Sequence, residues 1–345
     1  MNSSPLLDAL QAHQRGDLPA AESGYRAVLA GNPEQPDALH YLGVIAYQRR
    51  DHEEALSLIQ KARHAKPDDA AVAANLGLVL QAVGRLGEAA QALEASLALR
   101  PDQPEALHNL GLTRARQLRY PEAEALVRKA LELAPGHGQA RRQLGLVLLA
   151  MKRGREAAEV LGACLADQPK DTGLALELAR ARELSGDLDG AAAEYRDVAA
   201  RDPGRRVEAL CRLSTVLRRL GRHNTALVSA RAALFHDADS HDAVRAVGQC
   251  LKELGRLREA TRFFGRAHEM LRSPSSSAGL GRITFARTSK AKLRHDVEQF
   301  RYLLERGIGH DRFPAIIRDY EELMRTLPPS VGDGQVIQLP ARVQE

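Results

Sequence analysis

The sequence predicts an all-helical solenoid, because one pattern returns along most of the chain at a constant interval. Leucines recur every 34 residues, at Leu42, Leu76, Leu110, Leu144 and Leu178. Prolines keep the same spacing, at Pro33, Pro67, Pro101, Pro135, Pro169 and Pro203. A 34-residue period is typical of stacked helix-turn-helix units, which bury their apolar faces only against neighbouring units. About eight such repeats fit into residues 2–272.

Small residues mark where the two helices of a repeat meet. A glycine follows four of the repeat leucines, at Gly43, Gly77, Gly111 and Gly145. It is expected on the first helix, at a close crossing with the second. The matching small contact on the second helix is expected from Ala55, Ala89, Ala123, Ala157 and Ala191.

The residues between helices also have predicted roles. A mid-repeat glycine suits the left-handed conformation that ends a helix, at Gly16, Gly84, Gly186, Gly221 and Gly255. Other residues replace this glycine at Arg50, Leu118 and Lys152. The repeat proline is expected to stop the second helix and to be tolerated in the first turn of the next helix. After Pro203 the pattern slips by one residue.

The order Leu-Gly, Gly-Arg or Gly-Asp, Ala and Pro resembles the tetratricopeptide repeat (TPR) family. The resemblance implies a right-handed superhelix whose first helices line a concave groove that holds a peptide or helix of a partner protein. Asn75 and Asn109 are similar to the asparagine ladder in the TPR superhelix of O-GlcNAc transferase, where amides hold a peptide backbone. A side-chain amide both donates and accepts hydrogen bonds, so it can hold main chain without selecting side chains.

The period identifies the residues expected to face this groove. They precede or follow the repeat leucine, or lie one turn further along the first helix. The candidate partner-binding residues are Tyr41, Val44, Asn75, Leu78, Asn109, Leu112, Gln143, Leu146, Arg180, Arg218, Arg245 and Lys252. The earlier repeats thus present an apolar floor and the later repeats a basic one. We expect a protein or peptide partner with an apolar segment and an acidic segment. Chaperone-binding members of the family hold a carboxylate with Lys and Asn at these positions, so Val44 and Leu78 argue against a chaperone adapter.

Composition restricts the other function classes. The chain of 345 residues has a net charge of +5, and residues 138–272 carry 24 Lys and Arg against 18 Asp and Glu. Opposite charges are mixed throughout, without basic clusters interleaved with aromatic residues, so nucleic acid is not the expected partner. No apolar run is long enough for a signal peptide or a membrane span, which predicts a cytoplasmic protein. The resemblance to TPR proteins implies a bacterial one. Three single cysteines are expected to be reduced packing residues.

The C-terminal part differs from the repeats. Residues 273–288 contain "SPSSSAGLG" and are expected to form a flexible joint. Residues 289–327 have the apolar periodicity of two amphipathic helices, which would cap the last repeat. Residues 328–345 are expected to be a disordered tail or linker. The segment "KLRHDVEQFRYLLERG" is similar to segments of bacterial TPR proteins that continue into a 2-oxoglutarate-dependent oxygenase-like domain.

The sequence shows no catalytic, cofactor-binding or metal-binding constellation. Its His-Asp pairs are dispersed along the chain, and His52-Glu53-Glu54 is expected at the start of a helix. "GLGRITFARTSK" lacks the spacing of a phosphate-binding loop. The predicted function is therefore a non-enzymatic protein-interaction scaffold without a cofactor. The alternative is the substrate-recruiting half of a longer enzyme, a glycosyltransferase or oxygenase, with its catalytic domain beyond residue 345.

Overall fold

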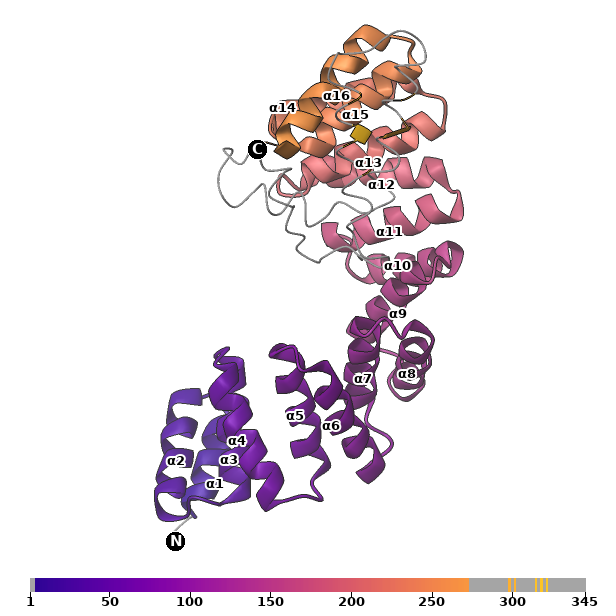
Figure 1. Cartoon of the computed structure of the whole chain (residues 1–345). Coiled ribbons are helices and arrows are strands. Elements are labelled where there is room, and N and C mark those ends of the chain that lie inside the picture. Colours follow the sequence, from indigo (N-terminus) through magenta and orange to yellow (C-terminus); the bar gives the residue numbers. More distant parts are fainter. Residues whose placement is uncertain are drawn as a thin grey trace. The chain divides into compact units, whose positions relative to one another are not determined.

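The computed structural model describes residues 4–272 and, beyond them, Val297, Glu298, Arg301, Pro314, Ile317, Arg318 and Glu321. In this part of the chain it contains sixteen helices and no strand, which confirms the predicted fold class (Figure 1). The chain divides into two compact units, Met1–Asp167 and Gln168–Glu345. Each unit is a stack of helix pairs.

The helices of the first unit are α1 (Pro5–Gln14), α2 (Leu18–Gly31), α3 (Pro36–Gln48), α4 (His52–Ala65), α5 (Ala70–Ala82), α6 (Leu86–Leu99), α7 (Pro104–Arg116), α8 (Tyr120–Leu133), α9 (Gly138–Ala150) and α10 (Gly154–Asp167). Those of the second unit are α11 (Thr172–Ser185), α12 (Leu188–Arg201), α13 (Arg206–Arg219), α14 (His223–His236), α15 (His241–Glu253) and α16 (Leu257–Arg272). They form the eight pairs that the repeats predict.

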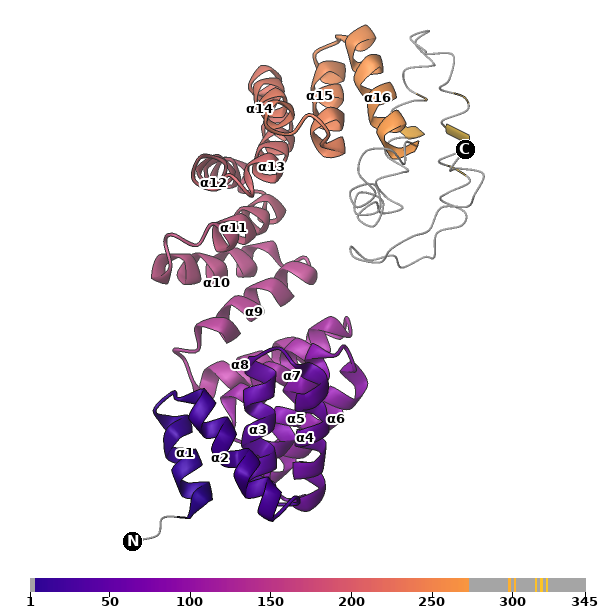
Figure 2. The same ribbon diagram turned by 90° about the vertical axis from the view of Figure 1, so that its left-hand side faces the viewer.

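Within a unit, several first helices of successive repeats lie next to each other. Within each unit, the two helices of a pair pack on each other, and a second helix then contacts the first helix of the following pair, as α4 does with α5 and α14 with α15 (Figure 2). Direct contacts also join α3 to α5, α5 to α7, α7 to α9 and α13 to α15. Helices α3, α5, α7 and α9 therefore share one face of the first unit, and α13 and α15 share one face of the second.

The repeat glycines lie where the two helices of a pair meet. A Cβ atom on Gly77 would lie 2.5 Å from Leu93 Cγ, and Gly43, Gly111 and Gly145 have equally close neighbours in Ile59, Val127 and Leu161. The five repeat alanines are fully buried, at 0% exposure: Ala55, Ala89, Ala123, Ala157 and Ala191. The atoms nearest the glycine thus come from the aliphatic residue four positions after the alanine, and at Gly111 the predicted Ala123 also lies close, with its carbonyl oxygen 3.3 Å from the added Cβ.

The left-handed residue between the helices of a pair is confirmed at every predicted glycine. Gly16, Gly84, Gly186, Gly221 and Gly255 have φ between 72° and 89°. The three residues that replace glycine adopt the same conformation, with φ of 66° at Arg50, 62° at Leu118 and 61° at Lys152. The geometry of the turn is therefore retained where its glycine is lost.

Two other details refine the sequence pattern. The repeat prolines lie in the loops after the second helices, and different prolines, Pro36 and Pro104, begin α3 and α7. The one-residue slip after Pro203 lies within the repeat of α13, because its left-handed residue Gly221 comes 18 positions after Pro203, whereas Leu118 comes 17 positions after Pro101.

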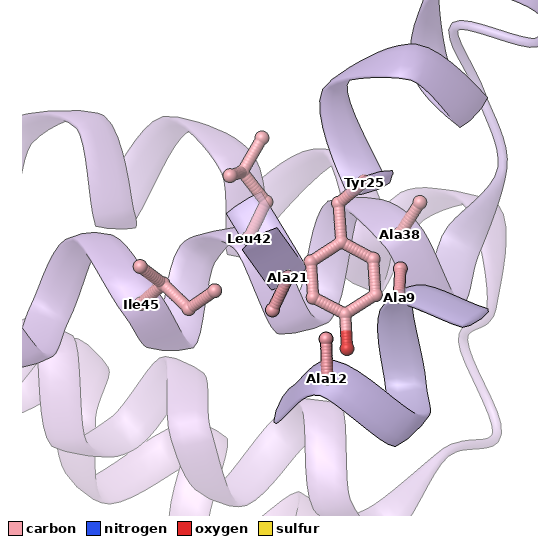
Figure 3. Close-up of a cluster of buried hydrophobic side chains, with 7 residues drawn as sticks. All are labelled: Ala9, Ala12, Ala21, Tyr25, Ala38, Leu42 and Ile45. Atoms are coloured by element: carbon pink, nitrogen blue, oxygen red, sulfur yellow. The ribbon is translucent and has the colours of Figure 1, made fainter. Parts of the chain in front are cut away.

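Alanines and a few large side chains form the cores. At the N-terminal end, Tyr25 is fully buried at 0% exposure, with its ring among the alanines of neighbouring helices (Figure 3). Its hydroxyl lies 3.2 Å from His13 Nδ1, and burial raises the pKa of Tyr25 to about 12. The cluster consists of Ala9, Ala12, Ala21, Tyr25, Ala38, Leu42 and Ile45.

The predictions for the C-terminal part fall mostly outside the described residues. The joint at 273–288 and the tail at 328–345 lie entirely outside them. Within 289–327, the seven described residues are helical, Val297 is buried, and Arg301 forms an ion pair with Glu321.

Candidate functional site

An apolar row lies on the first helices of the first unit. Leu78, Leu112 and Leu146 occupy equivalent positions on the adjacent helices α5, α7 and α9. Leu112 is 37% exposed and Leu146 is 41% exposed, whereas Leu78 and Val44 are half-buried. Helix formation does not require leucines at partly exposed positions, so this row is available for contacts outside the unit.

A hollow of about 410 Å³ lies between α5 and α7. Three predicted site residues, Asn75, Leu78 and Asn109, contribute to its wall. The remaining lining comes from Ala71, Ala74, Arg100, Asp102, Gln103, Pro104, Glu105 and Ala106. Ligand sites typically occupy roughly 300–1,000 Å³ and combine apolar walls with a few polar groups. The hollow has both properties.

The amide of Asn75 is held from one side by His40. Asn75 Nδ2 lies 2.7 Å from His40 Nε2, and His40 is only 6% exposed. Burial lowers the pKa of His40, so the neutral ring accepts this hydrogen bond at neutral pH. The contact joins residues on α3 and α5, and no sequence pattern indicates it. It fixes the orientation of the amide that lines the hollow.

Asn109 is positioned through its main chain. Its carbonyl oxygen accepts hydrogen bonds from Gln81 Nε2, at 2.6 Å, and from Thr113 Oγ1, at 2.9 Å. Its side-chain amide forms no hydrogen bond with another residue of the described chain. That amide remains able to donate to and accept from a ligand.

The loop before α7 gives the hollow a charged rim that the sequence analysis missed. The buried Gln103 donates to the carbonyl oxygens of Ser96, at 3.0 Å, and Arg100, at 2.6 Å. Its own oxygen accepts from Arg100 Nη2 at 2.9 Å. These bonds hold the loop that carries Asp102, and Glu105 follows in the first turn of α7. The sequence pattern at Pro101 indicates only a helix end, so it does not single out the neighbouring residues.

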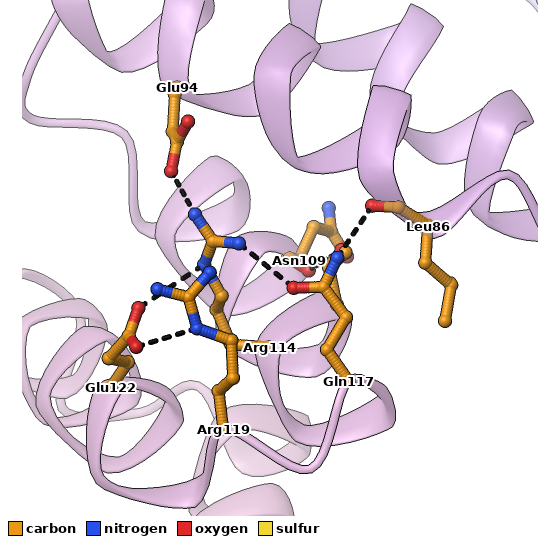
Figure 4. A network of polar contacts seen from close by, with 8 residues as sticks. Leu86, Glu94, Asn109, Arg114, Gln117, Arg119 and Glu122 are labelled. Atoms are coloured by element: carbon orange, nitrogen blue, oxygen red, sulfur yellow. Dashed lines mark hydrogen bonds and ion pairs between the residues drawn. The ribbon is translucent and has the colours of Figure 1, made fainter.

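A second network holds α7 between the two adjacent second helices. Arg114 is 12% exposed on its side chain and forms ion pairs with Glu94 of α6 and Glu122 of α8 (Figure 4). Gln117 donates to the carbonyl oxygen of Leu86 at 3.1 Å. The helix that carries Asn109 and Leu112 is therefore fixed on both sides.

Residues five positions after the repeat leucine, among them the predicted site residue Arg218, connect successive first helices. Gln81, 6% exposed, reaches from α5 to α7, as described above. At the equivalent position in the second unit, Arg218 donates to Gln249 Oε1 at 2.7 Å and forms an ion pair with Glu253, both of α15. The charge of Arg218 is thus balanced within the protein.

Two other predicted residues are engaged within the first unit. Gln143 is 6% exposed and lies against Gly111, whose Cβ would be 3.6 Å from Gln143 Nε2. A partner cannot reach Gln143 in this arrangement. Tyr41 is half-buried, with its ring stacked on Tyr25 at a centroid distance of 5.8 Å and 5.0 Å from the ring of His40.

The second unit carries the predicted cations on its first helices. Arg180 of α11 is exposed, and Arg245 and Lys252 of α15 are half-buried. Burial raises the pKa of Tyr195, while nearby Arg212 and Arg180 oppose that shift. Arg212 of α13 is therefore close to the same phenol as Arg180, and it is an additional cation beside the predicted ones.

Neither a metal centre nor a membrane span is present in the described part of the chain. No group of three or more His, Cys, Asp or Glu side chains among the described residues could hold a metal ion. None of the sixteen helices combines the length and apolar character needed to cross a bilayer.

Comparison with known proteins agrees with the fold. Two models described as tetratricopeptide repeat match residues 9–70 and 75–138, and residues 148–213, which together exceed half of the chain. A search of curated proteins found no match.

Solved TPR structures align over much of the chain. PilF of Pseudomonas aeruginosa is 26% identical with a TM-score of 0.51, over 62% of this chain and 96% of PilF. YrrB, described as a TPR protein with an unusual peptide-binding site, is 23% identical with a TM-score of 0.50, over 55% of this chain and 96% of YrrB. A TPR protein of Parabacteroides merdae is 18% identical with a TM-score of 0.50, over 72% and 97% of the two chains.

The period, the paired helices and the matching repeat models agree, and they support a protein-interaction scaffold. The chain belongs to the tetratricopeptide repeat family.

Proposed function

We propose that the first unit binds a peptide segment of a partner protein along α5, α7 and α9. Apolar side chains of the segment pack on Leu78, Leu112 and Leu146, and its main chain hydrogen-bonds to Asn75 and Asn109. The observation that carries this proposal is the hollow between α5 and α7, which two amides and a leucine line together.

The energetics favour this mode of binding. Leu112 and Leu146 keep 37% and 41% of their surface exposed, so covering each gains on the order of 1 kcal/mol. The bonds of Asn75 to His40 and of the Asn109 carbonyl to Gln81 reduce the ordering that binding requires. Apolar contacts supply the affinity, and the amides fix the position of the backbone.

We also propose that the second unit binds an acidic segment of a partner. Its contact residues are Arg180, Arg212, Arg245 and Lys252. Arg218 is left out of this set because Glu253 and Gln249 occupy its guanidinium. Long-range attraction of this kind raises the association rate more than it lowers the dissociation rate.

Selection from a random peptide display library on the immobilised protein tests the proposed apolar site on α5, α7 and α9. The selected peptides are expected to be rich in apolar residues and to dissociate at least several-fold faster from Leu112→Ala with Leu146→Ala, with little salt dependence. Leu133→Ala is the matched control, because Leu133 is also 41% exposed but lies on the second helix α8. Equal dissociation rates from the control and the double variant would place the binding site elsewhere.

The proposed acidic-peptide site of the second unit has a separate test with acidic peptides. Arg180→Glu with Arg212→Glu is expected to slow their association, and the loss should shrink as salt screens charges over about 8–10 Å. Wild-type association rates in this variant would rule out the second unit as the binding site for acidic peptides. They would leave the proposal for the apolar site on α5, α7 and α9 unaffected.

A further inference from the structure

Two large apolar side chains stand on the outer face of α14. Phe235 is 86% exposed and Val228 is 67% exposed. They are seven residues apart, which places them on the same side of the helix about 10 Å from each other. The opposite side of α14 supplies the core through Ala226, Leu227, Ala230 and Ala233. The exposed pair is therefore not part of the packing that holds the repeat together.

The other repeats do not share this feature. Relative to the buried alanine of each second helix, the equivalent positions hold small, polar or charged residues: Ser23 and Ala30, Ser57 and His64, Gln91 and Ala98, Ala125 and Glu132, Glu159 and Ala166, Ala193 and Ala200, and Arg262 and Glu269. The repeat fold thus needs no large apolar group there. An exposed Phe and Val carry a cost in solubility that a packing role does not explain.

Exposed arginines lie on the same helix as the pair and on α16. Arg231 is exposed on α14 between Val228 and Phe235, and the neighbouring helix α16 exposes Arg258 and Arg262. Two observations relate α16 to α14 and the loop that follows it. Arg266 Nη2 donates to the carbonyl oxygen of Ala238, just after α14, at 2.6 Å.

The second observation concerns Glu259 of α16. Its pKa is lowered first by the hydrogen bond from Arg256 and further by the charges of Arg231 and Arg262. Glu259 pairs with Arg256 at 2.7 Å, so it does not cancel the remaining arginines. The surface formed by Val228, Arg231 and Phe235 with Arg258 and Arg262, the α14–α16 face, combines two exposed apolar side chains with three exposed arginines, and Asp237 and Glu269 are exposed at its end.

We propose that the α14–α16 face is a second docking surface, separate from the groove, which takes an acidic amphipathic helix of a partner protein. Apolar residues of that helix, spaced one or two turns apart, cover Val228 and Phe235, and flanking Asp and Glu residues face the arginines. Charge complementarity selects the acidic partner. A single aromatic ring beside a valine offers little base stacking, so a protein segment fits better than nucleic acid.

The probe for this surface is a synthetic helical peptide with leucines at positions i, i+4 and i+7 and Glu at the remaining exposed positions. A matched peptide carries Lys in place of Glu. Fluorescence anisotropy with the full chain is expected to show at least ten-fold tighter binding of the acidic peptide. Val228→Ser with Phe235→Ser should weaken binding of the acidic peptide at least ten-fold while the helical circular dichroism and Tm stay unchanged, because both side chains are exposed.

Further variants separate this surface from the groove. Arg258→Glu with Arg262→Glu should weaken the acidic peptide at least ten-fold, with a loss that decreases at high salt. Leu112→Ala with Leu146→Ala should leave its affinity unchanged, so failure of the groove proposal would not affect this one. Unchanged affinity in Val228→Ser with Phe235→Ser would overturn the proposal. So would preferential, Phe235-dependent binding of single-stranded DNA or of anionic lipid vesicles.

Discussion

Gly77 of α5 lies directly against Leu93 of α6, so closely that a Cβ atom on Gly77 would be 2.5 Å from Leu93 Cγ. Leu93 is fully buried at 0% exposure, so it cannot move aside into solvent. The distance between the two helices of this repeat is therefore set by the absence of a side chain at position 77.

Gly77→Ala is accordingly expected to destabilise the first unit. Overpacking in a core typically costs about 1–3 kcal/mol, which exceeds the gain of up to about 1 kcal/mol from placing Ala in a helix. Gly87→Ala is the control, because Gly87 is also helical, in α6, and a Cβ atom added there would meet no neighbouring atom within 4 Å. Urea unfolding should show a loss at position 77 and no loss at position 87.

The turn at Leu118 leads to the opposite expectation. Leu118 has a φ of 62° and is 68% exposed. Its left-handed backbone is therefore strained, and its side chain buries little surface that would offset the strain. Leu118→Gly removes a strain of about 1–2 kcal/mol, and the greater freedom of glycine in the unfolded chain offsets part of it. The net effect should be a rise in Tm. Gly84→Leu, at the equivalent turn, should lower Tm, and a change in the same direction at both positions would contradict this account.

Much of this architecture could be predicted because the repeat imposes the same backbone requirement many times. Gly84 and Leu118 occupy the same turn, so the period identified the conformation even where the residue type did not. Side-chain orientation is less regular. Gln143 precedes a repeat leucine just as Asn109 does, yet Gln143 is buried and Asn109 lines the hollow. One position in the repeat thus has two environments, which only the packing of the neighbouring helices decides.

Contacts between repeats are the other part that the sequence could not provide. His40 and Asn75 are 35 residues apart, and Arg218 and Glu253 likewise meet across neighbouring helices. Periodicity indicates which face a residue occupies but not which partner it finds there. The exposure of Phe235 could not be predicted either, because a Phe in a helical repeat is more often a core residue.

Arg218 and Arg180 should differ in their effects on stability. Arg218 is 18% exposed on its side chain, bonds to Gln249 and pairs with Glu253, whose pKa is lowered in part by Arg218. Arg218→Ala leaves these partners unsatisfied, so we expect a loss of about 1–3 kcal/mol. Arg180→Ala should change stability little, because Arg180 is exposed. Thermal unfolding of the two variants checks this difference, and similar Tm values would contradict the structural role of Arg218.

The histidines between α7 and α9 predict acid sensitivity. The ring centroids of His108 and His137 are 4.9 Å apart, and burial followed by the neighbouring His137 lowers the pKa of His108 to about 4. His137 also caps α9, since its Nδ1 accepts from the amide of Ala140 at 3.4 Å. Gln143 and Glu105 oppose the shift of His108 without cancelling it.

The sign of this effect follows from proton binding. The unfolded chain protonates His108 near its ordinary pKa of about 6.5, whereas the folded chain does so only near pH 4. The contribution of His108 to stability is therefore complete above about pH 6.5 and is lost as the pH falls toward 4. It changes the unfolding free energy by at most about 1.4 kcal/mol per pH unit. Urea unfolding of the wild type and His108→Gln between pH 7.5 and 5 should show the flatter dependence in the variant, and parallel curves would exclude this role.

Gln81 and Asn109 separate stability from binding within one contact. Gln81 Nε2 donates to the main-chain carbonyl of Asn109, so Gln81→Ala removes a buried bond between α5 and α7 and should cost about 1–3 kcal/mol of unfolding free energy. Asn109→Ala keeps that carbonyl and removes only the side-chain amide, which forms no hydrogen bond within the described chain. The Tm of the Asn109→Ala variant should therefore stay near the wild-type value, while a peptide bound in the groove dissociates several-fold faster. In the proposed binding mode, Asn75 holds the same backbone from the other wall of the hollow, so adding Asn75→Ala to Asn109→Ala should deepen that loss. If Asn109→Ala lowered Tm as much as Gln81→Ala and left peptide dissociation unchanged, the amide at position 109 would belong to the packing of the repeats and not to the peptide site.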